Sequence, residues 1–125
     1  MIFLSLTPAK MTHKKAGQFE KAERAYRQSL AINVQMKDLE GEAASLYELG
    51  NLYDDMGHIE EAVAFNKQVV DICVKLLNLY REGMARQALA FSLIKLQRHD
   101  EARHELYRAI ECKKPYGHAA KPWTI

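Results

Sequence analysis

The sequence predicts an all-α fold, a right-handed α-solenoid built from antiparallel helix pairs. Segments that begin at Gly17, Gly57 and Gln97 resemble one another and start 40 residues apart each time. Each period holds two stretches in which apolar residues recur three or four positions apart, which is the spacing of one face of an amphipathic helix. No proline interrupts residues 9–114. A fixed period of this length is typical of stacked helix pairs.

The elements follow from this period and from the residues at its turns. We expect a short first helix over 8–16, with Thr7 as its N-cap and Pro8 at its first helical position. Gly17 and Gly57 should each end a helix in the left-handed conformation that glycine adopts at least cost. The further helices are expected over 19–36, 40–56, 59–77, 80–96 and 99–113.

Three other features of the period concern the turns, the starts and the packing of these helices. Gln97 replaces the glycine of the third copy, so its turn should be strained or differently shaped. Asp38 and Asn78, again 40 residues apart, are the expected N-caps of the helices that follow them. Small residues recur in phase where two antiparallel helices must cross closely, at Ala22, Ala62 and Ala102.

The chain is expected to form one domain, divided into repeats over 1–37 (with a shortened first helix), 38–77 and 78–114, and a tail or the start of a fourth repeat over 115–125. The last complete helix would then have an apolar edge that no later helix covers. Either the chain is a segment of a longer array, or another copy covers this edge. The expected edge residues are Leu106, Tyr107, Ile110 and Trp123.

The repeats carry a recognisable set of residues at fixed offsets. The second copy has Leu49, Gly50, Tyr53, Gly57 and Ala62, and the first has Gly17, Phe19, Ala22, Tyr26 and Ser29. This pattern resembles the tetratricopeptide repeat, and the 40-residue period is similar to the longer-repeat branch of that family. Asn66 departs from the pattern where an aromatic residue is usual, and Gln97 and Leu106 depart in the third copy. The resemblance implies a superhelix whose first helices line a concave groove.

The resemblance also implies a non-enzymatic scaffold that binds a protein or peptide partner in that groove. The groove-facing residues that it implies are Lys14, Lys15, Tyr47, Asn51, Asp54, Gln87, Phe91, Ile94 and Lys95. Asn51 can donate and accept hydrogen bonds at once, so it can pair with the backbone of an extended peptide, or else with a neighbouring repeat. Tyr47, Met84 and Ala88 occupy the positions where a carboxylate clamp would need basic or amide groups, so capture of a C-terminal carboxylate is disfavoured.

The sequence leaves open whether the groove has an apolar patch and whether the chain binds a peptide or a second copy of itself. Met84, Phe91 and Ile94 form either an adaptable apolar patch or ordinary packing against a following helix. The alternative to a peptide-binding scaffold is a self-associating structural fragment, a homo-oligomer with no dedicated peptide ligand.

Charge divides by repeat although the formal net charge is only +2. The net charge is +3 over residues 1–40, −5 over 41–80 and +4 over 81–125. This pattern would steer a partner or pair copies head-to-tail, unless it reflects only solvated helix faces. The near-neutral total favours neither nucleic acid nor a membrane surface as a partner.

No enzyme, metal or cofactor site is predicted. His104-Glu105 begins like the zinc-binding HExxH motif, but the second histidine is missing. Cys73 and Cys112 have no CxxC spacing and are interpreted as reduced thiols of a cytoplasmic protein. The apolar start of the chain lacks a basic region and is too short for a signal peptide.

Overall fold

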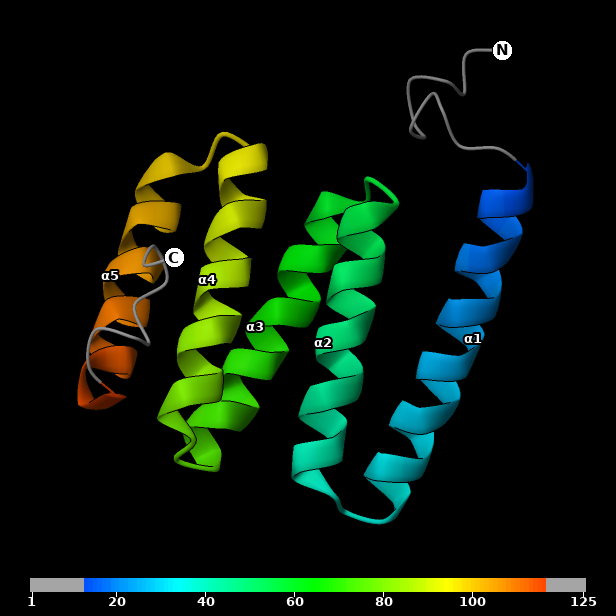
Figure 1. The fold of residues 1–125 in the computed structure, drawn as a ribbon, viewed down its shortest axis with the longest axis horizontal. Coiled ribbons are helices and arrows are strands. Elements are labelled where there is room, and N and C mark those ends of the chain that lie inside the picture. The colour runs from blue at the N-terminus through cyan, green and yellow to red at the C-terminus, as the bar shows by residue number, and fades with distance from the viewer. Residues whose placement is uncertain (1–12, 117–125) are drawn as a thin grey trace.

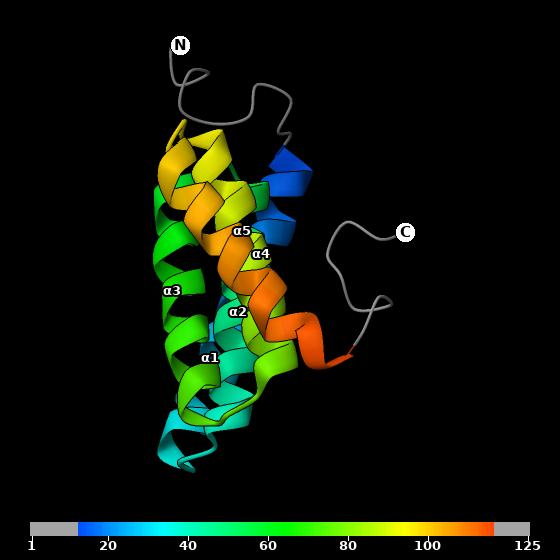
Figure 2. The same ribbon diagram turned by 90° about the vertical axis from the view of Figure 1, so that its left-hand side faces the viewer.

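The computed structural model describes residues 13–116 and is all-α over that range. Figure 1 shows the five helices side by side in chain order. Their bounds are α1 His13–Gln35, α2 Leu39–Asp55, α3 Ile59–Lys75, α4 Leu79–Lys95 and α5 His99–Lys113, followed by the 3-10 turn η2 Lys114–Tyr116. Each helix packs against its neighbours in the sequence, so the chain is a repeating row of antiparallel helices. The turned view of Figure 2 shows the same helices stacked one behind another.

The four later helices confirm the prediction to within two residues at each end. Two of them begin at the expected caps. The Asp38 carboxylate accepts a hydrogen bond from the Gly41 backbone N–H at 2.9 Å, and the Asn78 side chain accepts one from the Arg81 N–H at 3.0 Å. Each cap satisfies one of the N–H groups that a helix start leaves unpaired.

The predicted helix end at Gly17 is wrong, because α1 continues through this residue as one helix of 23 residues. A β-carbon added at Gly17 would have no neighbouring atom within 4 Å. The space beside Gly17 on α1 is therefore open among the described residues. Thr7 and Pro8, the expected start of a separate first helix, lie outside the described residues.

The turns between the later helices share one backbone geometry. Gly57 has a φ of 84°, and its N–H and that of His58 donate to the carbonyls of Asp54 and Tyr53. Gln97 has a φ of 64°, and its N–H and the next one donate to the corresponding carbonyls of α4. The third turn is therefore strained, as expected, but it is not differently shaped. Lys37 and Leu77 take the same left-handed conformation, both at φ 57°.

The core lies between the helices in two clusters. The first joins α2, α3 and α4 through buried residues such as Leu46, Val69 and Ala85, and the second joins α3, α4 and α5 through residues such as Val63 and Leu89. At the crossings of the paired helices, the small residues Ala62 and Ala102 are buried as the sequence pattern predicts. Ala22 is only half-buried, since α1 contacts a helix on one side only among those described.

Candidate binding groove

A groove runs between α2 and α4, with residues of α3 at its floor. It consists of two adjoining cavities of about 370 and 250 Å³. The first cavity is lined by Ala43, Ala44, Tyr47, Glu48, Val69, Cys73, Tyr80, Arg81 and Met84. The second is lined by Tyr47, Asn51, Asp54, Asn66, Met84, Gln87, Ala88, Phe91 and Ser92. Because Tyr47 and Met84 line both cavities, the two adjoin one another.

The period explains why these side chains face one another. Tyr47 and Asn51 on α2 are in phase with Gln87 and Phe91 on α4, 40 residues later. Equivalent positions on two parallel helices of a repeat array point the same way. The groove is therefore lined by corresponding turns of α2 and α4.

The structure brings together five of the residues that the family resemblance places in the groove. Tyr47, Asn51, Asp54, Gln87 and Phe91 all line the second cavity. Phe91 is 50% exposed, so half of its ring surface is open to a partner rather than packed within the described chain.

The other four predicted groove residues lie at or beyond the edges of the hollow. Lys95 and Ile94 are near the end of α4, where Ile94 is exposed and lines neither cavity. Lys15 is on α1, with its ammonium 5.8 Å from the centre of the Phe19 ring. Lys14 is also on α1, but only its backbone is among the described parts of the structure.

Asn66 is the groove residue that the sequence pattern failed to identify as a binding candidate. It lies on α3, is 2% exposed, and lines the second cavity. Its Oδ1 has no hydrogen-bond partner among the described residues. A signal was present in the sequence, because Tyr26 and Leu106 occupy the equivalent positions of the other repeats and Asn66 alone is polar.

Gly50 makes room for the Asn66 amide. A β-carbon at position 50 would lie 2.9 Å from the Asn66 Oδ1. This is closer than carbon and oxygen atoms normally approach, so the amide would have to shift. The Asn66 Oδ1 therefore lies against the backbone of α2 at Gly50.

An ion pair bridges the two walls of the groove at one end. The Lys95 ammonium on α4 lies 3.0 and 2.9 Å from the two carboxylate oxygens of Asp54 on α2. Asp54 is the one carboxylate among the residues that line the second cavity, and Lys95 neutralises its charge. In the first cavity, Glu48 and Arg81 supply one charge of each sign.

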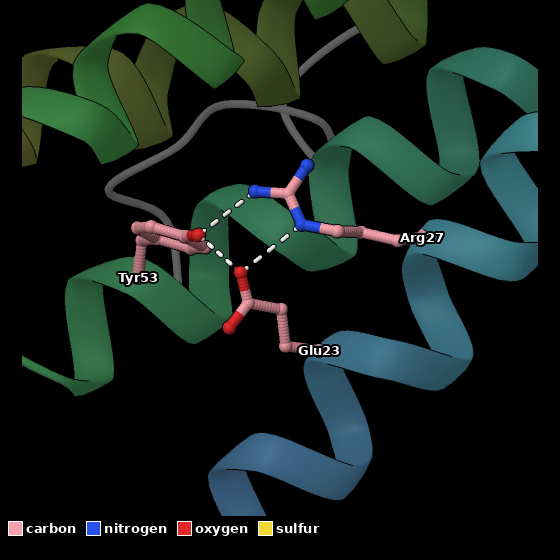
Figure 3. A network of polar contacts seen from close by, with 3 residues as sticks. All are labelled: Glu23, Arg27 and Tyr53. Carbon is pink, nitrogen blue, oxygen red and sulfur yellow. Dashed lines mark hydrogen bonds and ion pairs between the residues drawn. The ribbon is translucent and has the colours of Figure 1, made fainter.

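A second polar network fixes α2 on the side that faces α1 (Figure 3). Arg27 donates to Glu23 at 3.0 Å and to the Tyr53 hydroxyl at 2.8 Å, and the Tyr53 hydroxyl donates to Glu23. The hydrogen bond from Tyr53 is the main reason that the pKa of Glu23 lies below its ordinary value. Burial is the main reason that the pKa of Tyr53 is raised. This network holds the helix that carries Asn51 and Asp54.

A buried ion cluster fixes α4, the opposite wall. Arg86 donates to Glu82 on the same helix at 2.8 Å and to Glu105 on α5 at 2.7 Å. Arg86 and Glu82 are both buried. The wall formed by Gln87 and Phe91 is therefore tied to the helix behind it.

Three of the residues expected at the oligomer edge lie on α5. Leu106 is half-buried and packs against the second core cluster, and Ile110 is half-buried too. Tyr107 is 63% exposed. Trp123 lies outside the residues that the structure describes.

Within residues 13–116, no three His, Cys, Asp or Glu side chains gather closely enough to hold a metal ion. None of the helices described there is long and apolar enough to cross a membrane.

Comparison with known proteins identifies relatives of the repeats. The sequence model of the tetratricopeptide repeat family matches residues 9–73, which is more than half of the chain. The chain is also similar to tetratricopeptide repeat protein 29 of Trypanosoma brucei brucei (strain 927/4 GUTat10.1). The two are 30% identical over 83 residues, which cover 66% of this chain and 17% of that protein.

Proposed function

Because the chain belongs to the tetratricopeptide repeat family, we propose that it is a non-enzymatic scaffold whose α2–α4 groove binds a peptide or protein partner. The single observation that carries this proposal is the pair of adjoining cavities along α2 and α4. Its walls combine apolar surface with side-chain amides, the combination that positions a peptide through both its side chains and its backbone.

The rigidity of the two walls supports the same function. The Glu23–Arg27–Tyr53 network braces α2, and the ion cluster around Arg86 braces α4. A groove that is already formed spends less free energy on ordering when it binds, so more of the contact energy appears as affinity. A cytoplasmic location belongs to this proposal and is supported by Cys73 and Cys112, which are both free thiols.

The proposal is tested with a displayed library of random twelve-residue peptides, selected on the purified protein. The selected peptides are then titrated into isotope-labelled protein and followed by NMR. We expect backbone shifts that cluster on α2 and α4, and affinities that fall about tenfold or more in Asn51→Ala and Phe91→Ala, if both side chains contact the peptide. The matched control is Gln68→Ala on α3, an exposed residue outside both cavities. Shifts confined to α1 or α5 would contradict the proposal.

Self-association is the second candidate function, and the exposed Tyr107 on α5 is the observation that favours it. Light scattering over a range of protein concentrations tests it directly. A dimer that dissociates in Tyr107→Ser would support it, whereas a monomer at high concentration would exclude it.

A further inference from the structure

We propose that the groove selects an extended segment with a primary amide, from glutamine or asparagine, in the second cavity, next to an apolar side chain in the first. This inference rests on the proposed function, because it names the chemistry of the partner that the groove binds.

The floor of the groove holds an amide oxygen without a hydrogen bond. Asn66 is 2% exposed, and its Oδ1 has no partner among the described residues. Burying an amide oxygen without a hydrogen bond costs about 1–3 kcal/mol, and such groups are rare in native proteins. A leucine occupies the equivalent position in the third repeat, at Leu106, so packing alone does not require an amide here. Asn66 also lines the second cavity, so a half-turn of its amide away from Gly50 would present Oδ1 to a ligand there.

The amide lining of the second cavity favours a primary amide as the group of the ligand that binds there. Three side-chain amides line this cavity, Asn51 from α2, Asn66 from α3 and Gln87 from α4. A half-turn of the Asn51 or Asn66 amide exchanges its donor and its acceptor, whereas the Gln87 Oε1 already accepts a hydrogen bond from the Lys113 ammonium at 3.5 Å. A primary amide of the partner pairs with either orientation, because it presents a donor and an acceptor side by side. A carboxylate offers acceptors alone, and an ammonium offers donors alone.

The acidic side chain that lines the second cavity already has a partner of opposite charge. Asp54 is the acidic lining residue, and Lys95 already pairs with it through both carboxylate oxygens. A lysine of the partner would have to displace Lys95 or remain buried without a counter-charge, which is costly. A neutral amide requires neither change.

The neighbouring cavity defines the second feature of the partner. Val69, Cys73, Met84 and Ala43 give the first cavity a largely apolar lining. The two cavities share Tyr47 and Met84, so they accept side chains from one short segment. In an extended chain, residues i and i+2 point the same way and lie about 7 Å apart. The expected motif is therefore a bulky apolar residue and a Gln or Asn two positions apart.

The experiment uses synthetic seven-residue peptides with acetylated and amidated ends, which carry Leu-Ser-Gln or Gln-Ser-Leu in a Gly-Ser frame. In matched peptides, Glu, Lys or norleucine replaces the Gln, and each dissociation constant is measured by NMR titration. We expect the Gln peptide of one of the two orders to bind about tenfold more tightly than its three counterparts, as one neutral hydrogen bond in a buried site allows.

Two variants make the test specific to the floor of the cavity. In Asn66→Leu, the Gln and norleucine peptides should bind equally, and in Asn66→Asp the preference should change from Gln to Lys. Gln68→Leu, on the exposed side of the same helix, should keep the Gln preference. The change of preference in Asn66→Asp is a readout that loss of stability alone cannot produce.

The failures of the two proposals are distinguishable. If the norleucine, Lys or Glu peptide binds wild-type protein as tightly as the Gln peptide, with shifts on α2 and α4, the amide inference is overturned and the binding groove stands. If neither these peptides nor the library-selected ones produce shifts in the groove, both proposals fail.

Discussion

Gln97 carries a β-carbon in a backbone conformation that glycine adopts more easily. Its φ of 64° lies in the left-handed region, where a side chain costs about 1–2 kcal/mol. Gly57 occupies the equivalent position in the second repeat with the same turn geometry. We expect Gln97→Gly to raise the free energy of unfolding by about 0.5 kcal/mol, because the greater freedom of glycine in the unfolded chain offsets part of the relieved strain.

Urea denaturation measures this difference. The matched control is Gln68→Gly in the interior of α3, which should lower the free energy of unfolding by about 1 kcal/mol, the usual helix penalty of glycine. Equal losses in both variants would show that Gln97 is not strained.

Cys112 titrates differently in the folded and unfolded chains. Burial, together with the nearby Glu82, raises the pKa of this thiol from 9.0 to about 11. Between these values the unfolded chain holds fewer protons than the folded one, so the free energy of unfolding should fall as pH rises from about 9 to about 11. Denaturant titrations at several pH values should show this fall in wild-type protein and a smaller one in Cys112→Ala. An unchanged slope in the variant would contradict the assignment.

At the scale of the helices, a largely buried ion cluster joins α4 to α5. Arg86 pairs with Glu82 beside it and with Glu105 on the next helix. Arg86→Met would leave the buried carboxylate of Glu82 without a counter-charge. We expect a loss of about 3–5 kcal/mol in the free energy of unfolding, as when one partner of a buried pair is removed.

The control for this prediction is an exposed pair on α5. Arg103 lies 3.0 Å from Asp100, and both side chains are largely exposed. Arg103→Met should change the free energy of unfolding by less than about 1 kcal/mol. If the two variants lose the same amount in urea denaturation, burial does not strengthen the cluster at Arg86.

The sequence also shows which helices can be predicted from local signals. The starts of α2 and α4 follow from the caps Asp38 and Asn78, because capping is decided by residues only three positions apart. Gly17 misleads, because a glycine is also tolerated inside a helix, at a cost of about 1 kcal/mol relative to alanine, and α1 continues through it. The identity of the turn residue alone does not distinguish these two outcomes.

At the scale of the whole molecule, the period predicts which residues line the groove, but it does not predict the chemistry of the groove. Tyr47, Asn51, Gln87 and Phe91 follow from a regular spacing, since equivalent turns of stacked helices face the same way. The burial of Asn66 is not visible in the sequence, because only the structure shows that its Oδ1 is buried with no hydrogen-bond partner among the described residues. The link from Arg86 to Glu105 spans 19 residues and two helices, and no sequence period relates them.

Stability should be graded along the row of helices. None of the described side chains of α1 is buried, whereas α3 and α4 contribute to both core clusters. Burial supplies most of the stability of a helix within a protein, so α1 should open first. The network of Glu23, Arg27 and Tyr53 attaches it to α2 (Figure 3), and a hydrogen bond between Asn33 and Ser45 is a second polar link between the two helices.

Native-state hydrogen exchange tests this gradient through protection factors, which correct for the intrinsic effect of pH. In wild-type protein, we expect the smallest factors in α1. In Tyr53→Phe, which removes the hydroxyl shared by Glu23 and Arg27, the factors of α1 should fall about fivefold, the worth of roughly 1 kcal/mol, while those of α4 stay unchanged. Tyr107→Phe, which changes an exposed ring on α5, is the matched control.

The same network gives this gradient a pH dependence with a definite sign. The pKa of Glu23 is lower in the folded protein than its ordinary value of 4.5, chiefly because Tyr53 donates to its carboxylate. Its contribution to stability is therefore complete above pH 4.5 and is lost as pH falls through the lowered pKa. Acidification should reduce the protection of α1 more in wild-type protein than in Tyr53→Phe, where this hydrogen bond is already absent. An equal reduction in both proteins would show that the attachment of α1 does not depend on the Glu23 carboxylate.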